Sequence, residues 1–596
     1  FLDNLKSWGG NTVVTDVPWQ AIEKSEGTFD FSKVDPFMQH AADRDIKLII
    51  ALDAGILFGQ DPRQPSYQAA PKWLFDKYPE ARSMDYDGDA YPVLSFTHTQ
   101  ANAAFGRFIR TAVEHFTNTF GDAVIAYSPN FNNQMETRYM QQQLKWQDYG
   151  PSARQAYAVF LRDTYKTIDA LNSRWQTSFS DFAQVSLDEP RQGQAGFDPK
   201  IEPSYIDLMR FRENAIVKAI SSAAETVHQA GGQVFVHFGE VITKVDAIFT
   251  VPLELLAESA DIVAVDGHHL TADGLVTDPS ITGLIVSHAR AHGVAVIFED
   301  SVEVAAAPEF DKRRDFLVQE CIRWAQANGA DGIGFANFLQ RFDDQGIYTF
   351  QDTLPQTLKE TKTFKQKPVA LYASRWLQYT TYGTTDYRID GKAYDFYQSN
   401  VQGMFKLLED AGIPVAVLSD VAIANGMLDQ YDTLVLPYQL VVPEETYKKI
   451  LAFHDRGGNL IQDVRFAEFS LRGPREQGQL DDLFAVDVGE PGQETKANLK
   501  EILGALAPAS EIIVGDAKLQ TNRTAGFFST NKLTPRTGTK LYVSTSGEGG
   551  LVAINKGQNT AQLGFMPGLL YLQRSEAKVQ DSLRQLVAGV VEELRR

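Results

Sequence analysis

Cysteine, long apolar runs and nucleotide-binding loops are scarce or missing in this sequence, and each absence removes a class of protein. The 596 residues hold one cysteine, Cys321, which excludes an intrachain disulfide framework and a cysteine-based zinc cluster. Cys321 lies in a helical pattern, where a lone thiol is expected to pack as a small apolar side chain. No apolar run approaches the roughly 18–20 residues of a membrane span.

Several motifs that mark other enzyme classes are absent as well. There is no GxGxxG after a predicted strand and no GxxxxGK[ST], so the glycine pair of DRGGN is expected to be a helix cap rather than a phosphate loop. No G-x-S-x-G nucleophile elbow occurs, which weakens an esterase interpretation. No cluster of His, Asp and Glu has the spacing of a metal site. We therefore predict no cofactor and no required metal.

Basic residues are in deficit. The 76 acidic residues outnumber the 56 basic ones and give a formal net charge of −20, which argues against nucleic acid and anionic membranes as partners. With 43% hydrophobic and 22% charged residues the chain is globular, and its length predicts two to four domains.

Residues 1–365 alternate short β-rich runs with amphipathic helical patterns, which predicts a parallel sheet wrapped by helices. A closed (β/α)8 TIM barrel needs eight strands, and seven runs are present. The simplest account places the first strand upstream of residue 1, because FLDNLKSWGG is typical of a helix that precedes a strand; an open barrel or a missed strand are the alternatives. The seven runs are 11–16, 46–53, 123–127, 233–238, 261–266, 294–300 and 332–337.

The α/β pattern restarts at about residue 366. Apolar runs at 414–420, 433–439 and 459–464 again alternate with helical patterns, which predicts a second domain, 366–596, with an open doubly wound sheet. In the first domain a long insertion at 55–98, rich in aromatics and proline, is expected to form part of a pocket wall.

The stretch 123–139, AVIAYSPNFNNQMETRY, joins an apolar strand pattern to a polar loop that carries Glu136. Active sites of α/β barrels are built at the carboxyl ends of the strands. A second run, VAVIFED, ends at Glu299 and Asp300. Two carboxyl groups at strand ends suggest hydrolysis of a glycosidic bond. Other acidic residues at strand ends are Asp16, Asp53, Glu240 and Asp266.

Three further stretches occur in this order: WQAIEKSEGTFDF (19–31), APKWLFDKYPE (70–80) and DALNSRWQTSFSDFAQV (169–185). Together they resemble glycoside hydrolase family 42, the β-galactosidases. The restart at 368 is similar to the family's second domain, a glutamine-amidotransferase-like α/β unit that makes trimer contacts. The resemblance implies a TIM-barrel catalytic domain (1–365), an amidotransferase-like domain (366–596) and a homo-oligomer, a trimer. It also implies a retaining, exo-acting β-glycosidase, most simply a β-galactosidase.

The resemblance places catalytic glutamates after the fourth and seventh strands of the barrel. If the first strand lies upstream of residue 1, these are the runs 123–127 and 294–300. Glu299 would be the nucleophile and Glu136 the acid/base. Gln134 stands where the family has a glutamate after asparagine, so either the loop is two residues longer and Glu136 acts, or the proton donor is lost. We predict the first; the second would leave a non-catalytic sugar-binding pseudoenzyme. A β-mannosidase or an algal-galactan hydrolase of the same architecture is a further alternative.

Seven more residues are predicted to bind the substrate. Amides after the fourth strand suit a sugar hydroxyl but also form turns, and tryptophans suit sugar stacking but also pack in cores. The acid after the fifth strand suits a sugar hydroxyl, and a histidine after the sixth could hydrogen-bond the nucleophile. The seven are Asn132, Asn133, Trp19, Trp73, Glu240, His268 and Asn337. A cytoplasmic location is favoured, although a start without Met or leader pattern leaves the compartment open.

Overall fold

A computed structural model of the chain describes most of both predicted domains. The described residues are 1–7, 9–57, 67–131, 135–140, 145–188, 198–239, 241–242, 249–266, 278–300, 314–335, 366–381, 387–389, 392–394, 396–475, 479–491, 511–514, 517–520, 531–543, 550–573 and 577–596. The chain divides into two compact units. Unit 1 holds 1–191, 203–241 and 245–361, and unit 2 holds 362–596 together with 192–202 and 242–244.

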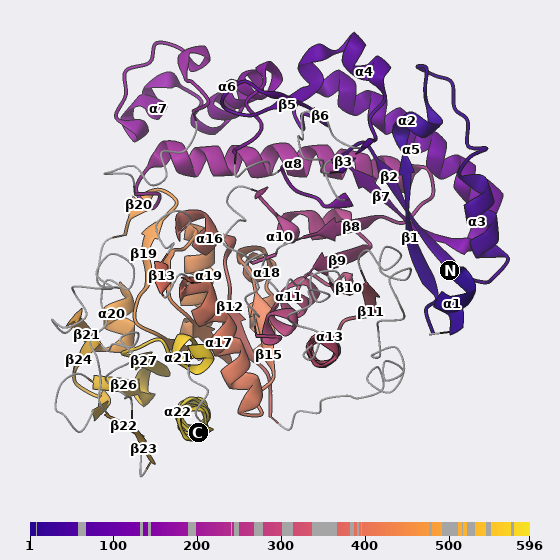
Figure 1. The fold of residues 1–596 in the computed structure, drawn as a ribbon. Coiled ribbons are helices and arrows are strands. Elements are labelled where there is room, and N and C mark those ends of the chain that lie inside the picture. Colours follow the sequence, from indigo (N-terminus) through magenta and orange to yellow (C-terminus); the bar gives the residue numbers. More distant parts are fainter. Residues whose placement is uncertain are drawn as a thin grey trace. The chain divides into compact units, whose positions relative to one another are not determined.

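Unit 1 is built on parallel strands that follow the order of the sequence. Strands β1, β2 and β7 pair side by side, as do β8, β9, β10 and β11, and a parallel bridge between Tyr127 and Val234 joins the two sets (Figure 1). Each of the seven predicted runs overlaps one of these strands, and β1 and β7 extend beyond their runs. They are β1 (Thr12–Pro18), β2 (Lys47–Asp53), β7 (Val124–Asn130), β8 (Phe235–Phe238), β9 (Ile262–Asp266), β10 (Ala295–Asp300) and β11 (Gly332–Phe335).

Amphipathic helices cover this sheet. Helix α5 buries residues at a spacing of three and four, among them Phe105, Phe108 and Phe116, and lies against α8 (Figure 1). The helix ends at Gly121, whose φ of +50° suits glycine at a helix C-terminus. The helices of unit 1 are α1 (Leu2–Ser7), α2 (Trp19–Ile22), α3 (Asp35–Ala42), α4 (Lys72–Lys77), α5 (Thr99–Phe120), α6 (Pro151–Tyr165), α7 (Ile168–Trp175), α8 (Pro203–Gln229), α10 (Leu253–Leu256), α11 (Ser280–Arg290) and α13 (Arg314–Ala327).

Two short hairpins lie in the region of the predicted insertion. They pair β3 (Ile56–Leu57) with β4 (Tyr67–Gln68) and β5 (Arg82–Met84) with β6 (Ala90–Leu94). Residue Asp85, between β5 and β6, forms an antiparallel bridge with Gln147, so this hairpin is joined to the chain that follows the Glu136 loop.

The inner face of the parallel sheet changes from apolar to polar along the strands. Residues that pair across parallel strands share a face, and every second residue returns to it. The lower part of this face is one buried cluster of Ile49, Ala126, Phe235 and Ala264, with Ile297 packed against it. Two or four residues further along the same strands the side chains are polar, so the carboxyl edge of the sheet is a polar floor. These residues are Asp53, Ser128, Asn130, His237, Asp266 and Glu299.

Unit 2 is built on a mixed sheet with the order β15-β12-β16-β18-β27-β26-β25. Its first five strands are parallel, and β26 and β25 are antiparallel to their neighbours. The strands are β12 (Val369–Tyr372), β15 (Val415–Leu418), β16 (Thr433–Leu436), β18 (Asn459–Gln462), β25 (Lys540–Val543), β26 (Gly550–Asn555) and β27 (Thr560–Leu563). Smaller sheets are made by β13 (Tyr387–Ile389), β14 (Lys392–Tyr394), β17 (Gln439–Val441), β19 (Phe466–Ser470), β20 (Gly473–Pro474), β21 (Val486–Pro491), β22 (Glu511–Val514), β23 (Ala517–Gln520) and β24 (Asn531–Pro535).

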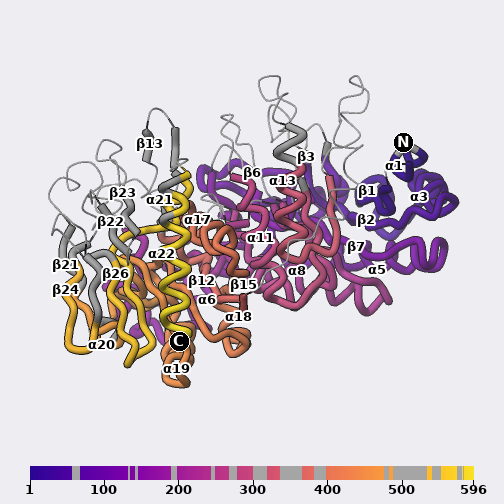
Figure 2. Tube along the Cα trace, turned by 90° about the horizontal axis from the view of Figure 1, so that it is seen from below, coloured from indigo at the N-terminus to yellow at the C-terminus, as the bar shows by residue number. Residues whose placement is uncertain are grey.

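Two glycines allow the helices of unit 2 to pack closely. A Cβ added to Gly403 of α17 would lie 1.9 Å from the carbonyl oxygen of Gly568 in α21, so neither position has room for a side chain. The long helix α22 packs against α17 and α21 (Figure 2). The helices are α16 (Arg375–Thr381), α17 (Phe396–Asp410), α18 (Asp420–Ala424), α19 (Glu444–Asp455), α20 (Gln479–Phe484), α21 (Pro567–Gln573) and α22 (Ala577–Arg595).

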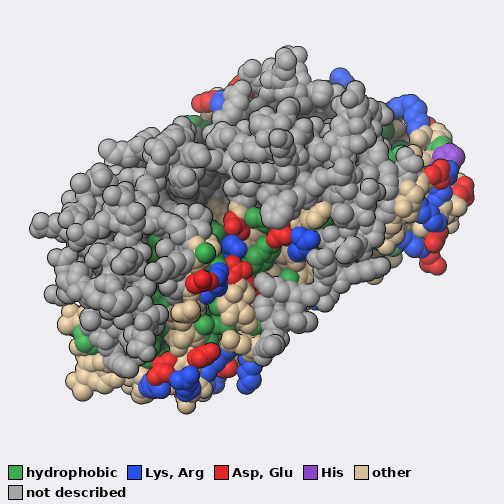
Figure 3. Space-filling view, turned by 60° about the horizontal axis from the view of Figure 1, so that its bottom comes forward, with side chains coloured by type: hydrophobic (Ala, Val, Ile, Leu, Met, Phe, Trp, Pro, Cys, Tyr) green, Lys and Arg blue, Asp and Glu red, His purple; other side chains and the backbone are tan. Residues whose placement is uncertain are grey.

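The charged surface, the helices and the single cysteine of the described residues agree with what the composition predicts. On the face drawn in Figure 3, acidic and basic side chains of the described residues lie next to one another. Within the described part of the chain, no helix is both long enough and apolar enough to cross a membrane. Cys321 is buried in α13, as its helical pattern predicts.

Candidate active site

Glu299 and His237 meet at the carboxyl edge of the parallel sheet in unit 1. Glu299 is paired in register with Asp266 of β9, and His237 is paired with Ala264 one step earlier on the same inner face. Glu299 Oε2 lies 3.2 Å from His237 Nε2, and the exposed fractions of the two side chains are 21% and 9%. The carboxylate is thus held at one side and still reached by solvent.

Glu136 is fixed against the end of β8 by its neighbours. The backbone N–H of Thr137 donates to the carbonyl oxygen of His237 at 2.7 Å, which ties the Glu136 loop to that strand. A Cβ added to Gly239 would lie 2.3 Å from Glu136 Oε1, so the carboxylate packs directly on the glycine backbone. Glu136 is buried and forms an ion pair with the buried guanidinium of Arg138. This pairing stabilises the ionised form of the carboxyl group.

The protonation of His237 is influenced by the charges around it. Burial lowers the pKa of its imidazole, while the negative charges of Glu136 and Asp266 oppose that shift and Arg138 adds to it. The ring is therefore neutral at pH 7, since its ordinary pKa is already near 6.5. The same ring contacts Glu299 and is within reach of the charge of Glu136, so both carboxyl groups lie near His237.

A buried arginine from α8 supports the Glu136 loop from behind. Arg212 is fully buried, and its Nε donates to Thr250 Oγ1 at 3.0 Å. Its guanidinium carbon lies 3.9 Å from the ring centre of Tyr139 and 5.0 Å from that of Trp146. Tyr139 Oη in turn donates to the carbonyl oxygen of Arg212 at 3.2 Å. These contacts fix Tyr139 and Trp146, which both follow Glu136 in the sequence.

A second contact fixes the same loop beside the carboxylate. The guanidinium carbon of Arg138 lies 4.1 Å from the ring centre of Phe249, and the N–H of Tyr139 donates to the carbonyl oxygen of Phe249 at 2.8 Å. Arg138 is therefore held by an aromatic ring on one side and by Glu136 on the other.

A third polar group occupies the same inner face on β1, β2 and β7. Asp53 is paired in register with Asn130, and both side chains are buried. Burial and the charge of Asp16 raise the pKa of Asp53 well above its ordinary value, while the donated hydrogen bond from Gly55 N–H opposes the rise. The carboxyl group of Asp53 therefore favours its protonated form more than a free aspartate does, because burial and a neighbouring negative charge both oppose its ionisation.

The family model described as Beta-galactosidase, glycoside hydrolase family 42, matches residues 2–374, which is more than half of the chain. The chain belongs to glycoside hydrolase family 42. The resemblance inferred from the three sequence stretches is thereby confirmed.

Curated β-galactosidases are similar to this chain over much of its length. Beta-galactosidase LacZ of Lactobacillus acidophilus is 20% identical over 476 residues, covering 74% of this chain and 66% of that protein. Beta-galactosidase bgaB of Geobacillus kaustophilus is 24% identical over 336 residues, covering 54% of this chain and 45% of that protein. The chain thus spans two thirds or less of the length of these two relatives.

Solved structures of β-galactosidases share the fold. The enzyme from Bacillus circulans sp. alkalophilus superposes with a TM-score of 0.72 at 14% identity, covering 99% of this chain and 85% of that one. The enzyme from Halorubrum lacusprofundi also gives 0.72, at 16% identity, covering 100% and 87%. This family 42 member therefore has the α/β, TIM-barrel-like fold predicted from the alternating pattern.

Trp19, one of the two predicted tryptophans, lies in the protein core. Trp19 is fully buried, and its ring packs against Phe105, Phe108 and Trp73. Its indole N–H donates to Glu23 at 2.5 Å. A ring enclosed in this way has no face for a sugar, so the prediction for Trp19 is wrong and its role is core packing. Trp73 is half-buried, with its N–H donating to the carbonyl oxygen of Glu23 at 3.0 Å.

Other predicted residues lie outside the described residues. They are Asn132, Asn133, Gln134, Glu240, His268 and Asn337. In the part of the chain that the structure describes, no group of three or more His, Cys, Asp and Glu side chains is arranged to hold a metal ion.

Sequence reasoning missed three residues of the site. His237 could have been found, because alternation in QVFVHF puts it on the same face as Phe235, two residues earlier. Asn130 stands at the end of β7 and carries a strand-end signal as clear as that of Asp53. Arg212 lies within an uninterrupted helical pattern and gives no local signal at all.

Proposed function

We propose that this protein is a retaining, exo-acting β-galactosidase that hydrolyses terminal β-linked galactosides by double displacement. The observation that carries the proposal is that Glu299 and Glu136 both border His237 at the carboxyl edge of the sheet. Family membership and the similarity to known β-galactosidases indicate the sugar.

In the first step Glu299 attacks the anomeric carbon and Glu136 protonates the departing glycosidic oxygen. In the second step Glu136 takes a proton from water, which displaces Glu299 and releases the sugar with its configuration retained. The partly exposed position of Glu299 suits a nucleophile that must reach the substrate. His237, neutral and in contact with Glu299, suits the role of orienting that carboxylate.

Glu136 must carry a proton when the substrate binds, and the ion pair with Arg138 opposes this. Substrate that excludes water from the site favours the protonated acid, as does the negative charge of Glu299.

The substrate and the stereochemistry are tested together. Aryl β-galactoside, β-mannoside and β-glucoside are offered to the protein, and proton NMR follows the first anomer released. We expect the galactoside to be hydrolysed fastest and the β-anomer to appear first. Faster hydrolysis of the mannoside, or the α-anomer first, would contradict the proposal. Glu299→Gln is expected to lower kcat by about 10⁴-fold or more, as loss of a nucleophile does.

A sugar-binding protein without catalysis is the second candidate. It is favoured by the Glu136–Arg138 ion pair, which keeps the carboxyl group ionised, and by Gln134 at the position where the family has a glutamate. Binding of galactose by calorimetry, together with no turnover of any of the three aryl glycosides, would support it.

The finer architecture is part of the same proposal. We propose an eight-stranded barrel followed by an amidotransferase-like domain at 366–596 and a trimer of 66.3-kDa chains. The mixed sheet of unit 2, with its parallel β15-β12-β16-β18 core, supports the domain type. Light scattering on the purified protein is expected to give the mass of three chains, and the mass of one chain would contradict the trimer.

A further inference from the structure

The inner face of the barrel sheet carries a polar group that the two-glutamate mechanism does not use. In register, Asp53 pairs with Asn130, Ala51 with Ser128, and Asp16 with Ala51. Residues paired in this way share a face, so Asp16, Asp53 and Asn130 point from β1, β2 and β7 to the same side as the apolar cluster beneath them. That side is the inside of the curved sheet.

The amide of Asn130 is half satisfied. Its side chain is 2% exposed. Ser128 Oγ donates to Asn130 Oδ1 at 2.8 Å, and Nδ2 has no hydrogen-bond partner in the described chain. If oxygen and nitrogen are exchanged, the hydroxyl accepts instead and the oxygen is the atom left over. Either way one polar atom of a buried amide is unused, which costs roughly 1–3 kcal/mol unless another group binds it.

The backbone holds this amide in place. Ala54 N–H donates to the carbonyl oxygen of Asn130 at 2.9 Å, and Gly55 N–H donates to Asp53 Oδ1 at 2.8 Å. The first hydrogen bond joins the ends of β2 and β7. The second occupies one carboxyl oxygen of Asp53 with the backbone two residues later. A rigid amide next to a carboxyl group is a preorganised pair that can both donate and accept.

We propose that Asn130 and Asp53 form a subsite that binds one uncharged hydroxyl group of the terminal sugar. The unused amide atom and the Asp53 carboxyl group contact that hydroxyl. This deepens the proposed function and rests on it. Asp16 lies on the same face of the sheet, and its acidic group disfavours a sulfate or carboxylate at the same sugar position.

The test pairs one substitution with single-atom changes of the substrate. Wild type and Asn130→Ala are assayed with 4-nitrophenyl β-galactoside and its 2-, 3-, 4- and 6-deoxy analogues. We expect Asn130→Ala to lower kcat/KM for the parent about tenfold or more, and for one deoxy analogue less than about twofold, because that analogue lacks the hydroxyl bound by the amide. An equal loss on all five substrates would overturn the proposal, since it indicates a structural role alone.

Two controls keep this test decisive. Asn172 is also an amide, but its Nδ2 donates to Phe179 O at 2.7 Å and its Oδ1 accepts from Phe179 N at 2.9 Å, so Asn172→Ala is expected to lower stability and leave the ratios between substrates unchanged. If Asn130→Ala does not fold, the isosteric Asn130→Asp replaces it with the same expected pattern.

Failure of the inference is distinguishable from failure of the proposed function. If wild type turns over no galactoside, calorimetry with galactose and its deoxy forms completes the same comparison by binding. A loss confined to one hydroxyl then supports the subsite in a protein without catalysis. Galactose binding that Asn130→Ala leaves unchanged would overturn it.

Discussion

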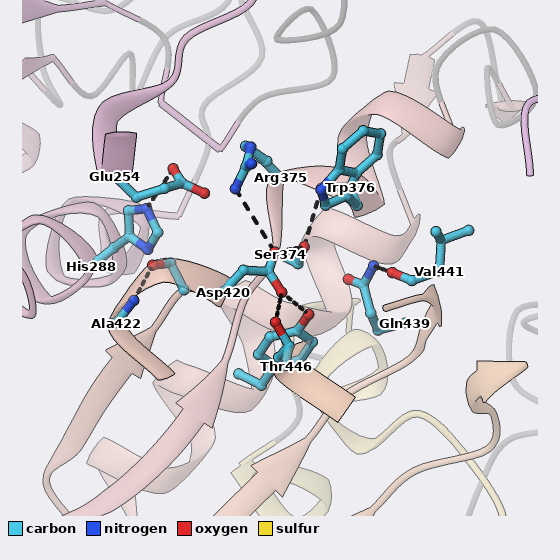
Figure 4. Close-up of polar contacts among 12 residues, drawn as sticks. Glu254, His288, Ser374, Arg375, Trp376, Asp420, Ala422, Gln439, Val441 and Thr446 are labelled. Carbon is cyan, nitrogen blue, oxygen red and sulfur yellow. Dashed lines mark hydrogen bonds and ion pairs between the residues drawn. The ribbon is translucent and has the colours of Figure 1, made fainter. Parts of the chain in front are cut away.

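Each unit buries an aspartate at the carboxyl edge of its parallel sheet, but the partners of the two aspartates differ. Asp420 of unit 2 accepts hydrogen bonds from Tyr372 Oη at 2.6 Å, Thr446 Oγ1 at 2.8 Å and Ser374 Oγ at 2.5 Å (Figure 4). Asp53 of unit 1 accepts one from Gly55 N–H and is repelled by Asp16. An aspartate enclosed by hydroxyl donors stabilises a fold, whereas one that faces another acid beside an unused amide costs stability and is suited to a ligand.

The largest expected effect is on the enclosed aspartate. Asp420→Ala leaves three buried hydroxyl groups without their acceptor, at about 1 kcal/mol or more each, so we expect unit 2 to lose about 3 kcal/mol of unfolding free energy. Urea unfolding measures this. The turnover of the folded fraction is expected to be unchanged, and a specific loss of kcat with no loss of stability would reverse the comparison.

A methyl group placed next to Glu136 is expected to lower turnover and to leave stability almost unchanged. In Gly239→Ala the new Cβ would lie 2.3 Å from Glu136 Oε1, so the carboxylate must move, and displacement by about 1 Å costs about 10²-fold in rate. We expect kcat to fall by about that factor with little change in melting temperature. Gly106→Ala is the control, because its Cβ meets only Thr226 Oγ1 at 3.8 Å; equal effects of the two substitutions would contradict the prediction.

Burial raises the pKa of both aspartates, so a substitution is needed to isolate the contribution of Asp53 to the pH dependence of stability. Since the pKa of folded Asp53 is raised, the folded protein keeps a proton that the unfolded chain releases above about pH 4. Stability therefore falls as pH rises, until Asp53 ionises in the folded state as well. Asp53→Asn removes this slope, so we expect it to be as stable as wild type at pH 4 and more stable at pH 7. Melting temperatures of wild type and Asp53→Asn between pH 4 and pH 7 test this prediction. A variant that is less stable than wild type at pH 7 would contradict it.

The smallest expected effect is a shift of the pH–rate profile. Arg138 stabilises the carboxylate form of Glu136, so Arg138→Met should raise the pH at which the acid loses its proton. The basic limb of kcat/KM is then expected to move to higher pH. Arg110→Met, at an exposed residue of α5 bound to Gln229, serves as the control and should leave the profile in place. A basic limb that stays where it is, or moves down, would show that Glu136 is not the titrating acid.

The architecture of unit 1 could be predicted because it depends on local patterns. Each parallel strand is a short apolar run, and the acids at strand ends are adjacent to those runs in the sequence. Trp19 could not be assigned, because a tryptophan after a strand looks the same whether its ring faces a sugar or packs on Phe105 and Phe108. The role of Arg212 could not be predicted from the sequence, because its partners Tyr139 and Thr250 are distant from it along the chain.

The claim most open to contradiction is that Glu136 is the acid/base of the site, although Gln134 occupies the family's position. Glu136→Gln should be assayed with two aryl β-galactosides, one with a good leaving group and one with a poor leaving group, with and without azide. Our account predicts that kcat/KM falls by about 10²–10⁴-fold for the poor leaving group, far less for the good one, and that azide restores turnover of the good one as a galactosyl azide. The same loss on both substrates with no rescue by azide, or no loss on either, would contradict it.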